Sequence, residues 1–251
     1  MRGASGSSPG RALLTWLGHG SFRLDSTEGV RIYVDPWLAG NPSCPEGEHD
    51  PERADVIVIT HGHVDHVEDA IAVWEKHRPT VIAQLEVRHW LERQGVEPDM
   101  SLAPNKGGTV TASGVGFTYT DARHSSSTPD GAYAGEACGV VVELEHGATI
   151  YFAGDTCVFG DMTLIGRLYE PDLAVLPIGG HFTMDPTQAA LALELLGVGR
   201  CVPCHYGTFP FLTGRPEQLS ALARGVEVHA LRPGETLEVA GGEWMPEEEE
   251  K

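Results

Sequence analysis

The sequence predicts an α/β protein in which two β-sheets pack face to face and helices cover their outer surfaces. Two patterns predict this architecture. Early in the chain, short apolar segments follow one another across glycine-containing turns, as strands paired in hairpins do. Later in the chain, short β-branched segments alternate with segments of helical periodicity. Hairpins followed by strand–helix alternation are typical of mixed sheets that stack in layers.

The first third of the chain contains short strands and one long loop. Strands are expected at 12–17 and 21–24, joined by Gly18-His19-Gly20. The apolar run 55–60 has the length and β-branched content of a buried strand, and apolar residues at helical spacing follow it over 67–77. Further elements expected up to residue 120 are a strand at 30–35, a loop at 39–54, a strand at 80–83, a helix at 86–94 and a hairpin of strands 109–112 and 115–120.

Longer strands and clearer helices follow the polar loop 125–135. A helix is expected at 186–196, because proline stands at its first position after Asp185, a good N-cap residue. The other expected elements are strands at 137–145, 148–153, 173–176, 201–204, 226–230 and 236–239, and helices at 162–169 and 216–224. The predicted organisation is a disordered segment 1–10, one domain over 11–241 and an acidic tail over 242–251.

Composition excludes several classes of partner. The 251 residues include 17 Lys and Arg against 36 Asp and Glu, a formal net charge of −19, which repels nucleic-acid backbones and anionic membranes. No apolar run has the length of a membrane span, and the first residues lack the apolar core of a signal peptide, so we expect a cytoplasmic protein. Five cysteines, an odd number, argue against a disulfide framework.

The segment Thr60-His61-Gly62-His63-Val64-Asp65-His66 carries four potential metal ligands between an apolar strand and a helix. In extended backbone, residues two apart point to the same side, so His61 and His63 can present their imidazoles in one direction. Asp65 and His66 follow in the first helical turn and can face a neighbouring point. A solvated histidine-rich loop is the alternative, which this spacing disfavours. The arrangement suits two metal ions, one at His61 and His63 and one at Asp65 and His66.

The HxHxDH pattern after an apolar strand resembles the signature of the metallo-β-lactamase superfamily. This resemblance implies the superfamily's fold, an αββα four-layer sandwich of two mixed β-sheets flanked by helices. It also implies three further ligands at strand ends, in a set order, and His124, Asp155 and His205 stand at those places. Each metal would keep one position open, as catalysis requires. The implied centre consists of site one with His61, His63 and His124, site two with Asp65, His66 and His205, and Asp155 as the bridging ligand.

Four other motifs resemble one subgroup of this superfamily, the metal-dependent hydrolases of the ascorbate-6-phosphate-lactonase-like branch. The resemblance runs from about residue 13 to 237. It implies a type of reaction but does not identify the substrate. The motifs are Trp16-Leu-Gly-His19-Gly-Ser-Phe22, Asp35-Pro-Trp-Leu38, His124-Ser-Ser-Ser127 and Pro177-Ile-Gly-Gly-His181-Phe-Thr-Met-Asp185.

Three residues of these motifs lie in Gly- or Pro-containing turns at strand ends, where functional side chains are often found. His181 is expected to face the cavity. His181 and His19 are candidates for catalytic groups that donate a hydrogen bond to a developing oxyanion or protonate the leaving group. For Asp35 a plain turn hydrogen bond is an equal alternative.

Three other features have a functional and a structural interpretation. The loop 125–135 is a candidate lid. Arg123 and Lys106 are candidates to meet a substrate phosphate, with pairing to surface acids as the alternative. Cys201-Val-Pro-Cys204-His205 matches a haem-attachment pattern, but ligation by His205 leaves the cysteines as packing residues.

The resemblance implies a metal-dependent hydrolase. A hydroxide between the two metal ions, oriented by Asp65, would attack a carbonyl or phosphoryl centre of a small-molecule lactone, ester, amide or phosphodiester. Imidazole and carboxylate ligands suit Zn²⁺ and also Mn²⁺ or Fe²⁺. A di-iron redox enzyme on the same fold and a non-catalytic metal-binding protein are the alternatives. The sequence leaves the substrate and the oligomeric state open, with a homo-oligomer among the options.

Overall fold

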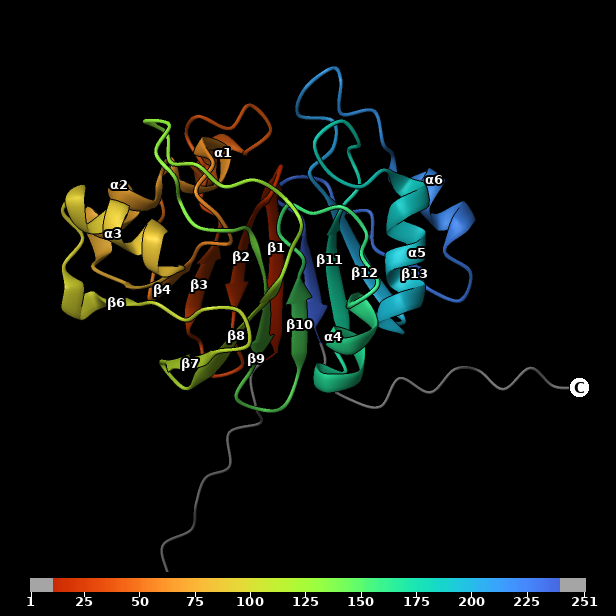
Figure 1. Cartoon of the computed structure of the whole chain (residues 1–251), viewed down its shortest axis with the longest axis horizontal. Coiled ribbons are helices and arrows are strands. Elements are labelled where there is room, and N and C mark those ends of the chain that lie inside the picture. The colour runs from red at the N-terminus through yellow and green to blue at the C-terminus, as the bar shows by residue number, and fades with distance from the viewer. Residues whose placement is uncertain (1–10, 240–251) are drawn as a thin grey trace, which may run out of the picture.

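The strands form two mixed seven-stranded sheets in the computed structural model, which describes residues 11–239 (Figure 1). The order in the first sheet is β14 (Thr236–Val239), β1 (Ala12–Gly18), β2 (Ser21–Asp25), β3 (Arg31–Val34), β4 (Val56–Val58), β5 (Thr80–Ile82) and β6 (Ser101–Leu102). The order in the second sheet is β13 (Glu227–Val228), β12 (Arg200–Cys204), β11 (Leu173–Pro177), β10 (Thr149–Phe152), β9 (Cys138–Glu143), β8 (Val115–Asp121) and β7 (Thr109–Ala112).

Each sheet is antiparallel in one part and parallel in the other. In the first sheet β14, β1, β2 and β3 are antiparallel, and β3 to β6 are parallel. In the second sheet β7 to β10 are antiparallel, and β10 to β13 are parallel. Strands β1 to β6 of the first sheet therefore precede all strands of the second sheet in the sequence. The last strand, β14, returns to the first sheet and pairs with β1. The predicted pair of mixed sheets is confirmed.

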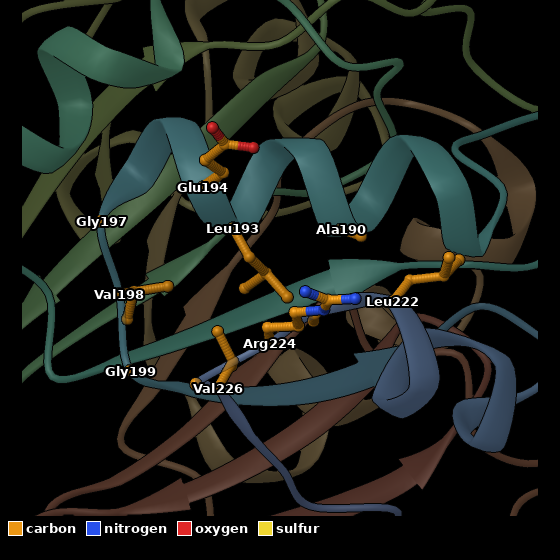
Figure 2. Close-up of a pocket in the computed structure, with 11 residues that line it drawn as sticks. Ala190, Leu193, Glu194, Gly197, Val198, Gly199, Leu222, Arg224 and Val226 are labelled. Atoms are coloured by element: carbon orange, nitrogen blue, oxygen red, sulfur yellow. The ribbon is translucent and has the colours of Figure 1, made fainter. Parts of the chain in front are cut away.

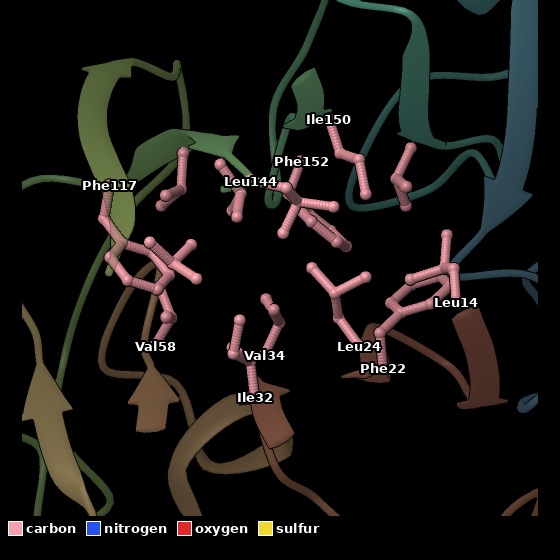
Figure 3. Close-up of a cluster of buried hydrophobic side chains, with 14 of the residues drawn as sticks. Leu14, Phe22, Leu24, Ile32, Val34, Val58, Phe117, Leu144, Ile150 and Phe152 are labelled. Atoms are coloured by element: carbon pink, nitrogen blue, oxygen red, sulfur yellow. The ribbon is translucent and has the colours of Figure 1, made fainter. Parts of the chain in front are cut away.

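The two sheets face each other across an apolar core (Figure 3). Because side chains alternate along a strand, every second residue of each strand points into this layer. Leu14, Leu24 and Ile32 from the first sheet meet Phe117 and Ile150 from the second. Burial of side chains from both sheets in one cluster is what holds the sheets together.

Helices cover the outer faces of both sheets and complete four layers, as the predicted αββα sandwich requires (Figure 1). Separate apolar clusters join the helices to each sheet. The helices on the first sheet are α1 (Val64–Val67), α2 (Ala70–His77) and α3 (Leu85–Arg93), those on the second are α4 (Met162–Tyr169), α5 (Pro186–Leu196) and α6 (Pro216–Leu222), and short 3-10 turns are η1 (Glu46–Glu48) and η2 (Pro98–Met100).

The predicted helix 67–77 differs from the structure, which has two helices separated by Glu68 and Asp69. The backbone N–H of Asp69 donates to the carbonyl of Pro36 at 3.1 Å, and its carboxylate accepts from the N–H of Leu38 at 2.5 Å. The break therefore anchors the loop after β3, next to the predicted metal ligands. The two-residue strand β6 was not predicted, because so short a segment carries no periodicity.

The predicted segments 1–10 and 242–251, and the end of the predicted domain at 241, lie outside the described residues. Across residues 11–239, no helix is both long enough and apolar enough to cross a membrane.

Candidate metal centre

The seven predicted ligands lie together at one edge of the sandwich. His61, His63, Asp65 and His66 follow β4 and enter α1. The others follow the second sheet's strands, which run in the same direction because β8 and β10 are both antiparallel to β9, and β10 is parallel to β11 and β12. The carboxyl ends of β8, β10 and β12 therefore meet at one edge, and the residues just beyond them are His124, Asp155 and His205.

His61, His63 and His124 form the first group of candidate ligands. Their ligand nitrogens all lie within 4.8 Å of one another. Nδ1 of His61 lies 3.0 Å from Oγ1 of Thr60, and Nε2 of His61 lies 3.0 Å from Nδ1 of His63. Thr60 thus contacts one ring nitrogen of His61, while a ring nitrogen of each of the three histidines converges on one point. The prediction of site one assigns one cation to these three histidines.

Asp65, His66 and His205 form the second group, with His19 as a fourth member. Oδ2 of Asp65 lies 3.9 Å from Nε2 of His66 and 3.8 Å from Nε2 of His205. The sequence placed the first three in site two and assigned His19 a different role.

Asp155 lies between the two groups. Its Oδ2 is 3.6 Å from Nε2 of His124, in the first group, and 3.2 Å from Nε2 of His205, in the second. Its Oδ1 is 3.5 Å from Nε2 of His66. Because one carboxylate can coordinate two cations through its two oxygens, this position is the one that a bridging ligand needs.

Several buried ring nitrogens of the second group have no hydrogen-bond partner. They are Nε2 of His66 and both Nδ1 and Nε2 of His205, although both side chains are almost fully buried. Leaving a buried polar atom unpaired is unfavourable by about 1–3 kcal/mol. Coordination by Nε2 of each imidazole would relieve this deficit at two of these atoms, and histidine and carboxylate donors suit a divalent transition-metal ion. The residues present therefore fit a metal centre.

The electrostatics separate the two groups of histidines. Burial lowers the pKa of His61 well below its usual value and also lowers the pKa of His63 and His124. These three imidazoles are neutral at pH 7, which is the form that binds metal. Burial also opposes protonation of His205, but the Asp155 carboxylate raises its pKa to about 9. Burial likewise opposes protonation of His66, yet Asp155, Asp35 and Asp65 raise its pKa well above the usual value.

Both carboxylates of the centre are held ionised. Burial alone would raise the pKa of Asp155, but the charges of His205 and His66 hold it well below its usual value. Burial likewise opposes ionisation of Asp65, and His66 and the hydrogen bond from His19 lower its pKa. Both carboxylates are therefore in the ionised form that binds a divalent cation.

Asp35 orients His66 from behind. Its Oδ2 accepts a hydrogen bond from Nδ1 of His66 at 2.8 Å, and the same carboxylate accepts from Oγ1 of Thr60 at 2.6 Å and from the N–H of Thr60 at 2.7 Å. A carboxylate that binds one ring nitrogen of a histidine leaves the other to face a metal and fixes the ring's orientation. Asp35 thus occupies a turn, where its φ is 48°, and its side chain also contacts the candidate metal ligand His66.

His19 lies behind Asp65 rather than in the open cleft. Its side chain is fully buried, and Nε2 lies 3.0 Å from Oδ2 of Asp65 while Nδ1 lies 3.0 Å from Oγ1 of Thr208. Burial lowers its pKa to about 4 although the hydrogen bond to Asp65 opposes this shift, so the ring is neutral at pH 7. A neutral histidine in this position can orient Asp65 or coordinate a cation, but it does not reach the cleft in which a substrate would bind.

The cleft beside the centre has a volume of about 250 Å³. His181 was expected to face it, and this expectation is wrong. His181 is exposed, with its ring 4.5 Å from that of Phe182 and 4.9 Å from that of Phe211. Positive φ values at Gly180 and His181 (72° and 58°) turn the chain so that Phe182 reaches the cleft instead. The cleft is lined by His63, Asp65, His124, Ser125, Asp155 and Phe182.

Sequence reasoning overlooked Phe182 and Thr208. The only signal for Phe182 was its place beside His181 in the glycine-containing motif. Thr208 had no signal, because it approaches His19 only through a contact between residues 189 positions apart.

The two basic residues near the centre are paired with acids. Nζ of Lys106 lies 2.5 Å from Asp121 and 2.8 Å from Glu136. The guanidinium of Arg123 lies 3.7 Å from Asp121 and over the ring of Phe159. Both residues therefore pair with acidic side chains, which is the alternative to contacting a substrate phosphate.

The candidate lid is tied to the strand-end segment that carries the histidines. The N–H of Gly62 donates to Oγ of Ser126 at 3.1 Å, and this hydroxyl donates to the carbonyl of Ala134 at 3.0 Å. Ser125 places its Oγ 3.5 Å from Nε2 of His63. These contacts hold both ends of the loop against the centre. A lid role stays a prediction.

A larger cavity of about 410 Å³ lies away from the centre, between α5 and the segment that follows α6 (Figure 2). Only Glu194 and Arg224 among its lining residues are charged, and none is a histidine or cysteine. It therefore offers no set of metal ligands. Cys201 and Cys204 are buried and free, as the packing interpretation predicted.

Comparisons with known proteins point to one family. A family model described as "Beta-lactamase superfamily domain" matches residues 30–206. The chain is 46% identical over 226 residues to a UPF0173 metal-dependent hydrolase of Koribacter versatilis, covering 89% of this chain and 96% of the relative. It is 50% identical over 236 residues to a UPF0173 metal-dependent hydrolase of Rubrobacter xylanophilus, covering 91% of this chain and 97% of the relative.

Solved structures show the same fold. Igni18, described as a novel metallo hydrolase from Ignicoccus hospitalis, superposes with a TM-score of 0.82 at 34% identity, covering 92% of this chain and 99% of that chain. CmlA, a diiron β-hydroxylase from Streptomyces venezuelae, has a TM-score of 0.71 at 16% identity and covers 92% of this chain and 55% of that chain. At this identity the similarity to CmlA concerns the fold alone.

Proposed function

We propose that this protein hydrolyses a small molecule at a centre of two divalent cations. The premise is that the chain belongs to the beta-lactamase superfamily and, within it, to the UPF0173 metal-dependent hydrolases. The observation that carries this proposal is the position of Asp155, whose carboxylate lies within 3.6 Å of histidines from both groups. A single-metal site would not need a carboxylate at that point. Each half of the sandwich would supply part of the ligand set.

The proposed ligands follow the two groups and leave the cleft open. When bound, the cations would lower the pKa of water and polarise the bond under attack. Zn²⁺ is our first choice of metal, with Mn²⁺ and Fe²⁺ as alternatives. We assign His61, His63 and His124 to site one, Asp65, His66 and His205 to site two, and Asp155 to both.

Asp65 is the chain's own group for handling the attacking water. Its side chain is 25% exposed and lines the cleft, whereas Asp155 is 5% exposed. Nε2 of His19 lies within hydrogen-bond distance of Oδ2 of Asp65. Because the pKa of Asp65 lies below its usual range, this carboxylate is ionised at pH 7 and can accept a hydrogen bond from water. His19 thus acts on catalysis through Asp65. A catalytic role for His181 stays a prediction, and its exposed position outside the cleft lining does not support one.

A hydrolysis screen tests the proposal. The protein would be reconstituted with zinc, manganese or iron in turn, its metal content measured by mass spectrometry, and its turnover assayed on lactone, ester, amide, phosphodiester and phosphomonoester substrates. We expect turnover of at least one bond class, and its loss together with metal in His61→Ala and Asp155→Asn. Asp161→Asn is a matched control, because Asp161 is an exposed acid of the second sheet's loops. Full activity in variants that bind no metal would contradict the proposal.

A di-iron redox enzyme is the second candidate, and the similarity to a diiron hydroxylase supports only its fold. Iron analysis with an oxygen-consumption assay separates the two functions. A non-catalytic metal-binding protein would bind metal but be inactive across the whole screen.

Other expectations also stay predictions. They are the assignment to the ascorbate-6-phosphate-lactonase-like subgroup, a cytoplasmic location, the absence of nucleic-acid and membrane partners, and a homo-oligomer.

A further inference from the structure

A row of aromatic side chains runs from the core to the cleft. The rings of Phe182 and Phe211 are 5.5 Å apart, those of Phe211 and Phe209 are 5.4 Å apart, and those of Phe209 and Trp37 are 6.2 Å apart. We call Trp37, Phe209, Phe211 and Phe182 the aromatic shelf. Ring separations of this size are those of packed aromatic pairs.

Exposure increases along the aromatic shelf toward the cleft. Trp37 is 7% exposed, Phe209 is partly buried, Phe211 is 44% exposed and Phe182 is 52% exposed. Large aromatic side chains left in water are unfavourable for the free protein and are characteristic of binding surfaces. The two phenylalanines therefore offer apolar surface that packing within the chain does not use.

The exposed end of the shelf adjoins the candidate metal centre. Phe182 lines the cleft together with Asp65, Asp155 and His124. The turn that carries Phe182 is tied to the segment after β10, because the N–H of Met184 donates to the carbonyl of Thr156 at 3.1 Å and that of Gly180 donates to the carbonyl of Met184 at 2.9 Å. A ligand reaching from Asp155 out of the cleft would meet the ring of Phe182.

Phe211 is held in place in a similar way. The loop after β12 begins at His205, and within it the N–H of Leu212 donates to the carbonyl of Phe209 at 3.0 Å, while the N–H of Gly207 donates to the carbonyl of Leu212 at 3.2 Å. The buried side chain of Leu212 anchors this loop. Both exposed rings thus stand on short, hydrogen-bonded segments: the loop of Phe211 starts at His205, and the turn of Phe182 is bonded to Thr156, the neighbour of Asp155.

The charges around the cleft disfavour an anionic substituent. None of the residues that line the cleft is lysine or arginine, and two of them are aspartates. Lys106 and Arg123, the basic residues next to the ligand strands, face acids. An anionic group on the substrate that lies too far away to contact the cations would have no basic side chain to pair with in the cleft lining. The formal net charge of −19 would also repel it.

We propose that the substrate carries a neutral, apolar acyl or aryl group that binds on Phe182 and Phe211 while its hydrolysable bond lies among the proposed metal ligands. This inference rests on the proposed function, since it adds the class of substituent to the substrate of the same cleft. Phe182 and Phe211 are then specificity-determining residues, and the binding free energy should increase with the apolar area of the substituent.

The test uses alkyl hydroxamic acids, which bind divalent cations through two oxygens and are not hydrolysis substrates of the screen. Affinities of the zinc-loaded full chain for acetohydroxamic, butyrohydroxamic and octanohydroxamic acids are measured by calorimetry. Suberic acid monohydroxamate serves as an analogue of the longest of these with a carboxylate at its far end. We expect the affinity to rise about two- to fourfold per methylene, since full burial of a methylene corresponds to about fourfold and the shelf covers one side.

Variants assign the effect to the two rings. Phe182→Ala and Phe211→Ala should flatten the dependence on chain length, with a larger loss of affinity for octanohydroxamic acid than for acetohydroxamic acid. Phe182→Leu should restore much of the dependence on chain length. Leu168→Ala is the matched control, because Leu168 is a 71% exposed apolar residue on α4. It should behave like the unaltered protein.

Four results would overturn the proposal: equal affinity for all chain lengths, equal affinity for the carboxylate-ended analogue, no hydroxamate binding, or the same loss in Leu168→Ala as in Phe182→Ala. Failure of the proposed function is distinct from these. Chain-length-dependent binding without turnover of any bond would contradict hydrolysis and keep the shelf, whereas turnover with flat binding would contradict only the shelf.

Discussion

The carboxylate of Asp35 accepts a hydrogen bond from Nδ1 of His66 at 2.8 Å, and the other nitrogen of that imidazole faces Asp155 at 3.5 Å. One side of the ring is therefore held by the turn after β3, and the other is free to coordinate a cation. This relationship links a residue outside the HxHxDH segment to the predicted metal centre.

Asp35→Asn should weaken zinc binding about 10- to 100-fold, because the substituted side chain no longer orients and polarises His66 as a carboxylate does. Competition with a chromophoric chelator measures the affinity, and thermal unfolding checks that the variant is folded. Asp185→Asn is the control, since asparagine caps helix α5 about as well as aspartate and Asp185 contacts no proposed ligand. Equal zinc affinity in Asp35→Asn and the unaltered protein would contradict the role of Asp35.

Asp155→Asn should reduce the metal content from two ions to one or none and lower kcat/KM by at least about a hundredfold, which corresponds to about 3 kcal/mol. The reason is that the amide keeps one neutral oxygen where the carboxylate offers two charged ones to both groups of histidines. Metal analysis and steady-state kinetics on one preparation measure both effects. A variant that retains two ions and full activity would show that Asp155 does not bridge.

Metal binding should release protons at pH 7. Asp155 and its neighbours raise the pKa of His66, and that of His205 reaches about 9, so both are protonated in the metal-free protein but must be neutral to bind a cation. Affinity should therefore rise with pH up to about 9. Calorimetry in two buffers of different ionisation enthalpy measures the protons released, and identical heats in both would contradict the prediction.

The same shifts give the stability of the metal-free protein a defined pH dependence. A histidine whose pKa is raised on folding stabilises the protein fully below its unfolded pKa of about 6.5. For His205 this contribution is lost as the pH rises through about 9.

Gly20→Ala should disturb the centre although position 20 binds nothing. A Cβ there would lie 2.7 Å from Cε1 of His66, so the imidazole or the turn must move. We expect a loss of stability of about 1–3 kcal/mol from overpacking, together with weaker zinc binding. Gly160→Ala is the matched control, because a Cβ at that position meets no atom within 4 Å. Denaturant unfolding and chelator competition measure the two quantities, and unchanged zinc affinity in Gly20→Ala would contradict the expectation.

His19 and His181 should differ in their effect on turnover. His19→Ala removes the contact with Asp65 at 3.0 Å, and kcat/KM should fall about 10- to 100-fold, as expected for loss of a group that orients a catalytic carboxylate. His181 is exposed and contacts phenylalanine rings outside the proposed ligand set, so His181→Ala should change kcat/KM by less than about threefold for an acetyl ester. The opposite order of effects would restore His181 as a catalytic residue.

Local signals predicted several elements to the residue. Helices α4 and α5 have the predicted bounds, and α5 begins with Pro186 after Asp185, whose side chain accepts from the N–H of Gln188. Proline at the first position and the N-cap hydrogen bond act within one helical turn, so a short stretch of sequence contains them. The helix after His66 was predicted less well, because its interruption at Glu68 and Asp69 depends on contacts with the loop of Pro36 and Leu38.

The candidate site divides in the same way. The HxHxDH segment is contiguous, so its histidines and aspartate could be recognised together, and the superfamily resemblance supplied the three later residues. The sequence could not place the partners of these groups, since Asp35 and His66 are 31 positions apart and His19 and Thr208 are 189 apart.

The sequence by itself determined the periodicity of the strands and helices, the α/β class and the residue types available to bind metal, because these depend on neighbours within a few positions. Only the tertiary structure decided that β14 pairs with β1, that Asp155 faces both groups of histidines, and that Phe182 rather than His181 enters the cleft. These outcomes depend on which strand ends meet at one edge of the sandwich and on the backbone angles of a single turn, and neither is expressed in the local pattern of residues.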